Sequence, residues 1–117
     1  MYSPTINPMP IGPVTVVTAG TPVRLISELI TLGNCLSGDW VQVNKIFLFS
    51  LPSNSGNIYL GLQTMNKATL QGVMALIGPG GGWSITNPVG MNVYRADQMY
   101  VDADNSGEGL GGSIDQV

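Results

Sequence analysis

The sequence predicts an all-β protein: a single antiparallel β-sandwich of jelly-roll or immunoglobulin-like type with an extended proline-rich N-terminal arm. Runs of β-branched and aromatic residues recur at short intervals, turn residues separate them, and no convincing amphipathic helix interrupts them. A chain of 117 residues suffices for one domain with one modest core. We expect the arm over residues 1–13 and one sandwich domain over residues 14–117, ending in a glycine-rich tail over residues 109–117.

The first segment is rich in proline, with Pro4, Pro8, Pro10 and Pro13 all within the first 13 residues. Proline lacks a backbone donor and fixes φ, so this segment is extended and not helical. Two interpretations remain open: an arm that lies on a partner, or a disordered terminus. On the first interpretation the four prolines are candidate interface residues.

A strand, a turn and a second strand are expected next. Residues 14–18 are all β-branched, residues 19–22 form a Gly-containing and Pro-containing break, and residues 23–26 alternate between apolar and polar types. Residues 27–36 carry apolar side chains without a clean period of two, and they fit either a loop or a short helical turn.

The strongest strand signal covers residues 40–51, where aromatic, aliphatic and β-branched residues follow one another and a proline ends the run. Its second half is continuously apolar, which suggests burial on both faces. Residues 53–56 have the composition of a hairpin turn. We therefore expect residues 57–61 to return as the antiparallel partner of this strand.

The rest of the chain repeats the same pattern. Residues 63–70 form a polar connection, and a glycine-rich loop covers residues 78–82. Short apolar or β-branched runs, each expected to be a strand, occupy residues 72–77, 83–86, 91–94 and 98–101.

Charged residues are scarce: they make up 9 % of the chain, against roughly 25 % of a typical soluble domain. Interface cores are depleted of charge, so we interpret this composition as a surface that partners cover; a β domain simply rich in Gly, Thr and Asn is the alternative. Four basic residues and a net charge of −3 offer no patch for phosphates, so no nucleic-acid partner is expected. No apolar run is long enough to cross a bilayer and no secretory signal begins the chain, so we expect no membrane partner and synthesis in a cytoplasm.

The inventory of reactive side chains argues against catalysis. The chain contains no histidine, which excludes Ser-His and Cys-His nucleophile pairs. The single cysteine, Cys35, forms no internal disulfide and reads as a small buried hydrophobe. A paired-carboxylate hydrolase is the remaining enzymatic interpretation, with candidate acids Asp97, Asp102, Asp104 and Glu108. We predict no enzymatic activity, no catalytic residue and no cofactor.

One stretch resembles half of a calcium loop. Asp102, Asp104 and Ser106 place oxygen atoms at its first, third and fifth positions, and Gly107 occupies the sixth. The twelfth position is Ser113 and not the glutamate that chelates through both oxygens, and no helices flank the loop. The alternative is a turn of Asp, Asn and Gly that ends a strand. We predict no metal site. Asp102, Asp104 and Ser106 are the residues that would bind calcium if this stretch were a calcium loop.

The aromatic residues admit two interpretations as well. They form either a platform on which sugars stack or ordinary core and cross-strand pairs, and the residues concerned are Trp40, Tyr59, Trp83, Tyr94 and Tyr100. Trp83 follows the glycine-rich loop directly, and we expect it to be an exposed aromatic anchor and an interface residue.

Several stretches resemble a class of small tailed-bacteriophage virion proteins of the capsid decoration, or cement, type. The resemblance is carried by AGTPVRL at residues 19–25, SGNIYLG at residues 55–61, NVY at residues 92–94 and MYVDADNSGEG at residues 99–109. The proline-rich start and the glycine-rich end depart from that pattern.

The resemblance implies a non-enzymatic virion structural protein, made in the host bacterial cytoplasm, that binds the outer capsid surface and stabilises adjacent capsid subunits. The partners it implies are further copies of the chain, as a homotrimer, and the major capsid protein. Repeated weak contacts on a symmetric lattice would gain from avidity. The alternative is a tail, neck or head-fibre accessory protein, or a receptor-binding or carbohydrate-binding module of a phage virion.

Overall fold

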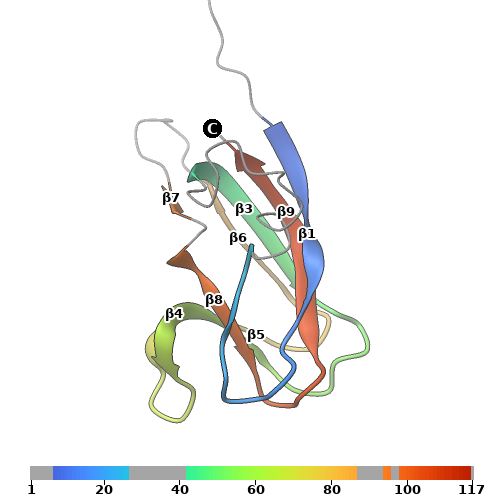
Figure 1. Cartoon of the computed structure of the whole chain (residues 1–117). Coiled ribbons are helices and arrows are strands. Elements are labelled where there is room, and N and C mark those ends of the chain that lie inside the picture. The colour runs from blue at the N-terminus through green and yellow to red at the C-terminus, as the bar shows by residue number, and fades with distance from the viewer. Residues whose placement is uncertain (1–6, 27–41, 87–93, 96–97, 117) are drawn as a thin grey trace, which may run out of the picture.

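The computed structural model describes residues 7–26, 42–86, 94–95 and 98–116, which form two antiparallel sheets packed as a β-sandwich (Figure 1). Sheet A consists, in spatial order, of β1 (Asn7–Thr15), β9 (Gly109–Gln116), β3 (Gln42–Ser50) and β6 (Gly82–Thr86), and β7 (Tyr94–Arg95) also pairs with β3. Sheet B consists of β2 (Val23–Arg24), β8 (Tyr100–Ala103), β4 (Ile58–Asn66) and β5 (Gln71–Ile77). The predicted all-β sandwich is confirmed.

The core lies between the two sheets and follows from the period-two pattern of the strands. Ile46 and Leu48 on β3 are fully buried, as are Ile58 and Leu60 on β4. Because alternate side chains of a strand point to opposite faces, each sheet contributes one apolar row to the interior. The same cluster includes Ile11, Val14, Val16, Leu25, Ile26, Ile77, Met99, Val101, Ala103, Leu110 and Ile114.

The apolar run of β3 is not buried on both faces, so that expectation was wrong. Phe47 and Phe49 alternate with the buried Ile46 and Leu48, and they remain 43 % and 39 % exposed. Sheet A packs on sheet B with one face, and these two rings lie on the other.

The predicted hairpin between residues 40–51 and 57–61 was also wrong. β3 pairs with β9 along one edge and with β6 and β7 along the other, whereas β4 pairs with β5 and β8 in sheet B. Both edges of β3 are therefore occupied by strands distant in sequence. The turn residues that follow β3 carry the chain to the opposite sheet instead of folding it back.

The predicted glycine-rich tail is an interior strand of sheet A. β9 lies between β1 and β3 (Figure 1). Its glycines allow this close packing, because a Cβ at Gly109 would overlap the Val14 carbonyl oxygen and a Cβ at Gly112 would overlap that of Phe47. Glycine within a strand marks a close approach of backbones here, not a flexible end.

Residues 7–13 of the predicted arm are also part of the sandwich. β1 runs antiparallel to β9 at the edge of sheet A, with Pro8 opposite Asp115 and Pro10 opposite Ser113. Prolines two residues apart share one side of a strand, and an edge strand tolerates them where the missing donor faces away from its neighbour. The free edge of β1 therefore offers few donors to an added strand.

Some predictions fall on residues outside the described ranges. These are Pro4, the undecided segment 27–36 with Cys35, Trp40, most of the expected strand 91–94, and Asp97. The first expected strand, residues 14–18, ends at Thr15.

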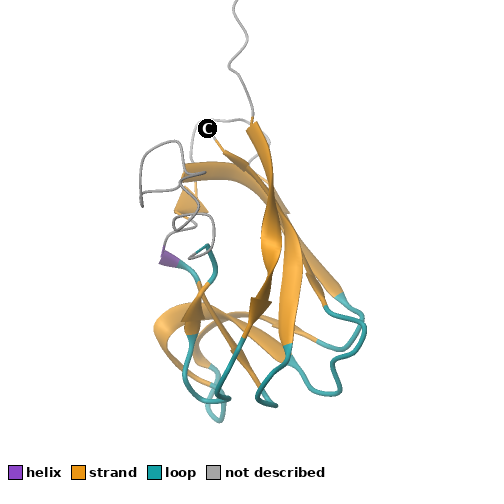
Figure 2. Ribbon diagram, turned by 45° about the vertical axis from the view of Figure 1, so that its right-hand side comes forward, coloured by secondary structure: helices purple, strands orange, loops and turns teal. Residues whose placement is uncertain are grey.

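Most described loops gather at one end of the sandwich (Figure 2). The β1–β2, β3–β4 and β8–β9 connections, which each cross between the sheets, are joined there by hydrogen bonds. This loop cluster is the part of the fold that holds the acidic residues singled out in the sequence.

We expect Gly112→Ala to destabilise the protein by about 3 kcal/mol, because the added methyl group forces β9 away from β3. Urea unfolding measures this as a lower midpoint with an unchanged slope. Ser113→Ala, an exposed change on the same strand, is the control and should fall within about 0.5 kcal/mol of the original chain. Equal midpoints for the two variants would contradict the packing described for β9.

Candidate functional site

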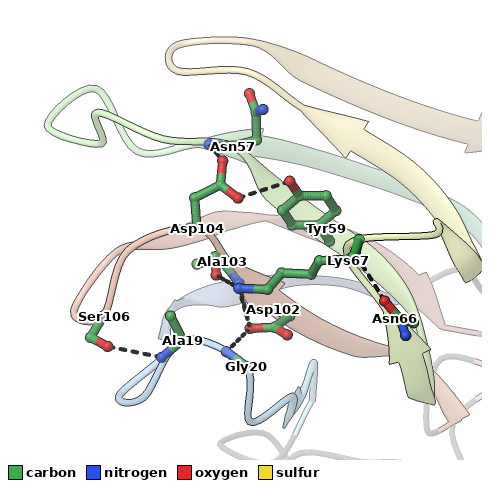
Figure 3. A network of polar contacts seen from close by, with 11 residues as sticks. Ala19, Gly20, Asn57, Tyr59, Asn66, Lys67, Asp102, Ala103, Asp104 and Ser106 are labelled. Carbon is green, nitrogen blue, oxygen red and sulfur yellow. Dashed lines mark hydrogen bonds and ion pairs between the residues drawn. The ribbon is translucent and has the colours of Figure 1, made fainter.

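Asp102 is a buried carboxylate that ties sheet B to the β1–β2 connection. Its side chain is 2 % exposed, and Oδ1 accepts hydrogen bonds from the Gly20 amide at 2.9 Å and the Ala103 amide at 2.7 Å (Figure 3). Lys67 lies over it from the β4–β5 turn, with Nζ 4.0 Å from Oδ1 and 2.6 Å from the Ala103 carbonyl oxygen to which it donates. The buried charge is thus compensated by amides and a nearby cation.

Asp104 points in a different direction, toward the β3–β4 connection. Oδ1 accepts the Tyr59 hydroxyl at 2.8 Å, and Oδ2 accepts the Asn57 amide at 3.0 Å. The hydrogen bond to Asp104, together with burial of the phenol, raises the pKa of Tyr59. Both carboxylate oxygens of Asp104 therefore hold groups of sheet B and of the loop that leads into it.

The calcium candidates Asp102 and Ser106 both accept amides of the β1–β2 connection, whereas Asp104 accepts groups of the β3–β4 connection and of β4. The Ser106 hydroxyl accepts the Ala19 amide at 2.9 Å, and Figure 3 shows the three side chains directed toward different partners. Among the described residues, no group of three or more His, Cys, Asp or Glu side chains gathers around a point that a metal would occupy. The arrangement has the form of a turn stabilised by side-chain acceptors.

Glu108 closes the same loop cluster. Its Oε2 accepts the Ser55 amide at 2.7 Å and the Ser55 hydroxyl at 3.0 Å, and its Oε1 accepts the Gly56 amide at 3.0 Å. The Asn105 side chain donates to Oε1 at 3.3 Å. The backbone hydrogen bond from Ser55, followed by that from Gly56, lowers the pKa of Glu108.

Asn54 is a buried amide that the sequence analysis did not single out. Its Nδ2 donates to the Gly109 carbonyl oxygen at 2.6 Å and to the Ser50 hydroxyl at 2.8 Å, and its Oδ1 accepts the Gly109 amide at 3.3 Å. The side chain thereby pairs with the first residue of β9 as a neighbouring strand would. No local signal in the sequence identifies this role, because the partner lies 55 positions away.

Chemically, these contacts fasten loops to one another. The oxygens of Asp102, Asp104 and Glu108 accept hydrogen bonds from backbone amides of connections that cross between the sheets. Because these polar side chains are occupied in holding the loops, we look to the outer faces of the sheets for a surface that binds partners.

The outer face of sheet A carries a pair of aromatic side chains whose neighbours on the adjacent strands are small residues. The rings of Phe47 and Phe49 have centroids 6.1 Å apart and planes inclined by 39°. Their register partners on both neighbouring strands are glycine or serine. We call this surface the phenylalanine face, and it consists of Lys45, Phe47, Phe49, Gly82, Ser84, Thr86, Gly111, Ser113 and Asp115.

The two rings lie against glycine backbone. A Cβ at Gly111 would stand 3.0 Å from Cζ of Phe49, and a Cβ at Gly82 would stand 3.7 Å from Cε1 of Phe47. Aromatic side chains that cover cross-strand glycines support the sheet while leaving the outer side of each ring exposed. The result is an apolar surface with one cation and one anion, Lys45 and Asp115, opposite each other at one end.

Phe47 and Phe49 were not among the candidate residues, because the apolar run that contains them was interpreted as buried on both faces. The signal that identifies them is Lys45, which shares their parity and marks that side of the strand as solvent-facing. Ile46 and Leu48, on the other parity, then belong to the core.

Of the five aromatic candidates, the structure describes the side chains of Trp83, Tyr59 and Tyr100, and none of these three is fully exposed. Trp83 is half-buried and packs against the core, so it is not the exposed anchor expected. Tyr59 is buried and donates its hydroxyl to Asp104, and Tyr100 is half-buried on β8.

The described proline candidates, Pro8, Pro10 and Pro13, lie on β1 at the opposite edge of sheet A from β6. Pro10 and Pro13 are exposed on β1, and Pro8 belongs to the same strand. They border β9, whose exposed Ser113 lies on the phenylalanine face.

Within the described part of the chain, no helix has the length and apolarity needed to cross a membrane. No protein-family model matches the sequence, and no curated protein shows significant sequence similarity to it.

We expect Glu108→Gln to lower stability at pH 7 and to reduce the dependence of stability on pH. Since folding lowers the pKa of Glu108, its contribution is present above the unfolded value of 4.5 and is lost as the pH falls through the folded value. Urea unfolding at pH 7, 4.5 and 3 should show a difference between the two proteins that shrinks with acidity. Asp115→Asn removes an equal charge outside the loop cluster and serves as the control; a difference that is constant with pH would refute the assignment.

Proposed function

We propose that the protein is a non-enzymatic structural protein of a bacteriophage virion that binds the outer capsid surface and cements adjacent capsid subunits. The observation that carries the proposal is the phenylalanine face, where two large aromatic side chains remain exposed on a sheet face whose charged residues are Lys45 and Asp115. Aromatic side chains are enriched in protein interfaces, and charged residues are depleted at the interface centre.

The distribution of charge supports this proposal. Of the few acidic groups, Asp102, Asp104 and Glu108 accept hydrogen bonds inside the loop cluster. The phenylalanine face therefore becomes buried with little desolvation of charge, which is the main cost of covering a polar surface.

The mode of contact follows from the edges of sheet A. Because Pro8 and Pro10 limit strand addition along β1, partners are expected to meet the sheet through its outer face and its side chains. The prolines then serve as rigid apolar contacts at the border of that face.

The size of the contact favours repeated binding. Covering the exposed parts of Phe47 and Phe49 is worth about 4 kcal/mol, from about 200 Å² for a whole phenylalanine and about 25 cal/mol per Å². One such contact does not exceed the cost of immobilising a partner, whereas several linked copies do. A homotrimer on a capsid lattice meets this requirement, with the major capsid protein as its partner.

A tail, neck or head-fibre accessory protein would use the same kind of face against another virion component. The partner that retains the protein distinguishes the two roles: expanded capsids for a decoration protein, and isolated tails for an accessory protein.

The test is co-sedimentation of the full chain with expanded capsids, combined with analytical ultracentrifugation of the free protein. We expect a trimer that sediments with capsids, and we expect Phe47→Ser combined with Phe49→Ser to weaken capsid binding more than tenfold. Both changes are on an outer face, so circular dichroism and the melting temperature should show a retained fold.

Val17→Ser, which changes a 73 % exposed residue in the β1–β2 connection, is the matched control and should bind as the original chain does. The proposal would be overturned if the protein were a monomer that does not sediment with capsids, or if the double serine variant bound capsids normally.

A further inference from the structure

The edge of sheet A formed by β6 borders the phenylalanine face and differs from the edge formed by β1. In the part of the chain that the structure describes, β6 is the last strand on its side of the sheet and pairs only with β3. It contains no proline and no charged residue, and its register with β3 has no shift from Gly82 to Thr86. Proline, charge and bulges are the usual means by which proteins keep a sheet edge from pairing. The edge of β6 therefore has the form of one that accepts a further strand.

The direction of the backbone groups of β6 follows from one hydrogen bond. The Ser50 amide donates to the Gly81 carbonyl oxygen at 2.9 Å, so these two residues are a hydrogen-bonded pair of the antiparallel ladder. Such pairs alternate along a ladder, so Trp83 and Ile85 direct their backbone groups toward β3. The amides and carbonyl groups that point to the free edge belong to the alternate residues, Gly82, Ser84 and Thr86.

Both faces of β6 carry apolar surface that an added strand would cover. On the outer face, the Phe47 ring leans toward β6, because a Cβ at Gly82 would stand 3.7 Å from its Cε1. On the inner face, Trp83 and Ile85 pack against the core and yet stay half-buried. Side chains of a strand alternate between the two faces of a sheet. A strand that fits beside β6 therefore has apolar side chains on both of its faces.

We propose that β6 binds an extended, uncharged segment of the capsid partner by strand addition, with backbone hydrogen bonds to Ser84 and its alternate neighbours. The apolar side chains of that segment contact Phe47 on the outer face and Trp83 on the inner face. A charged side chain in the segment would be buried without an opposite charge, because β6 carries none. The phenylalanine face and the edge of β6 thus form one continuous contact, and the identity of the partner rests on the proposed function.

The first test is Ser84→Pro, which removes an amide that points to the free edge and leaves the hydrogen bonds between β6 and β3 in place. We expect co-sedimentation of the full chain with expanded capsids to weaken about tenfold. Circular dichroism and the melting temperature should show a retained fold, because an edge strand tolerates proline at such a position.

Thr15→Pro is the matched control on the opposite edge of the same sheet. The Val16 amide donates to the Glu108 carbonyl oxygen, so the amide of Thr15 points to the free edge of β1. The two variants therefore lose the same kind of backbone donor, and Thr15→Pro should bind capsids as the original chain does.

The second test is hydrogen exchange, which does not depend on a variant. In the free protein the Ser84 amide should exchange faster than those of Trp83 and Ile85, as measured by ¹H–¹⁵N spectra. On capsids, mass spectrometry should show slower exchange over residues 82–86. Normal capsid binding by Ser84→Pro, or unchanged exchange of residues 82–86 on capsids, would overturn strand addition and leave the proposed function standing. Failure of the original chain to bind capsids would overturn both.

Discussion

The fold depends on carboxylates of β8 and of the β8–β9 connection, which accept backbone amides of the β1–β2 and β3–β4 connections. In a sandwich whose chain repeatedly crosses between sheets, the crossings leave amides without strand partners, and side-chain acceptors can satisfy these amides. Asp104 and Glu108 supply acceptors to the β3–β4 connection, and Asp102 supplies one to the β1–β2 connection. A protein with few ionisable groups thus uses several of them to hold its loops together.

This loop cluster also positions the surface that we assign to binding. Glu108 immediately precedes β9, and Asn54 pairs with the Gly109 backbone at the start of that strand. β9 is thereby held between β1 and β3, where its glycines admit the ring of Phe49. The hydrogen bonds of the loop cluster therefore help to position β9, which in turn forms part of the phenylalanine face.

The sequence predicted what is local and failed where the partner is distant. Alternation and turn residues located most strands and the sandwich class correctly, because these depend on neighbouring positions. Pairing of β3 with β9, and the role of Asn54, depend on residues more than 50 positions away. The glycines of residues 109–112 were misinterpreted as a tail because composition alone does not distinguish a flexible end from a close backbone approach. The exposed pair Phe47 and Phe49 was missed because the residues of that strand were not divided into a solvent-facing row and a core-facing row.

The proline-bearing edge of β1 has a consequence for behaviour at high concentration. At high concentration a bare sheet edge templates an open-ended fibre, because it recruits one chain after another. Pro8 and Pro10 deprive that edge of the donors on which such growth depends. Open-ended growth of the sheet through the edge of β1 is thereby disfavoured even where the protein is concentrated.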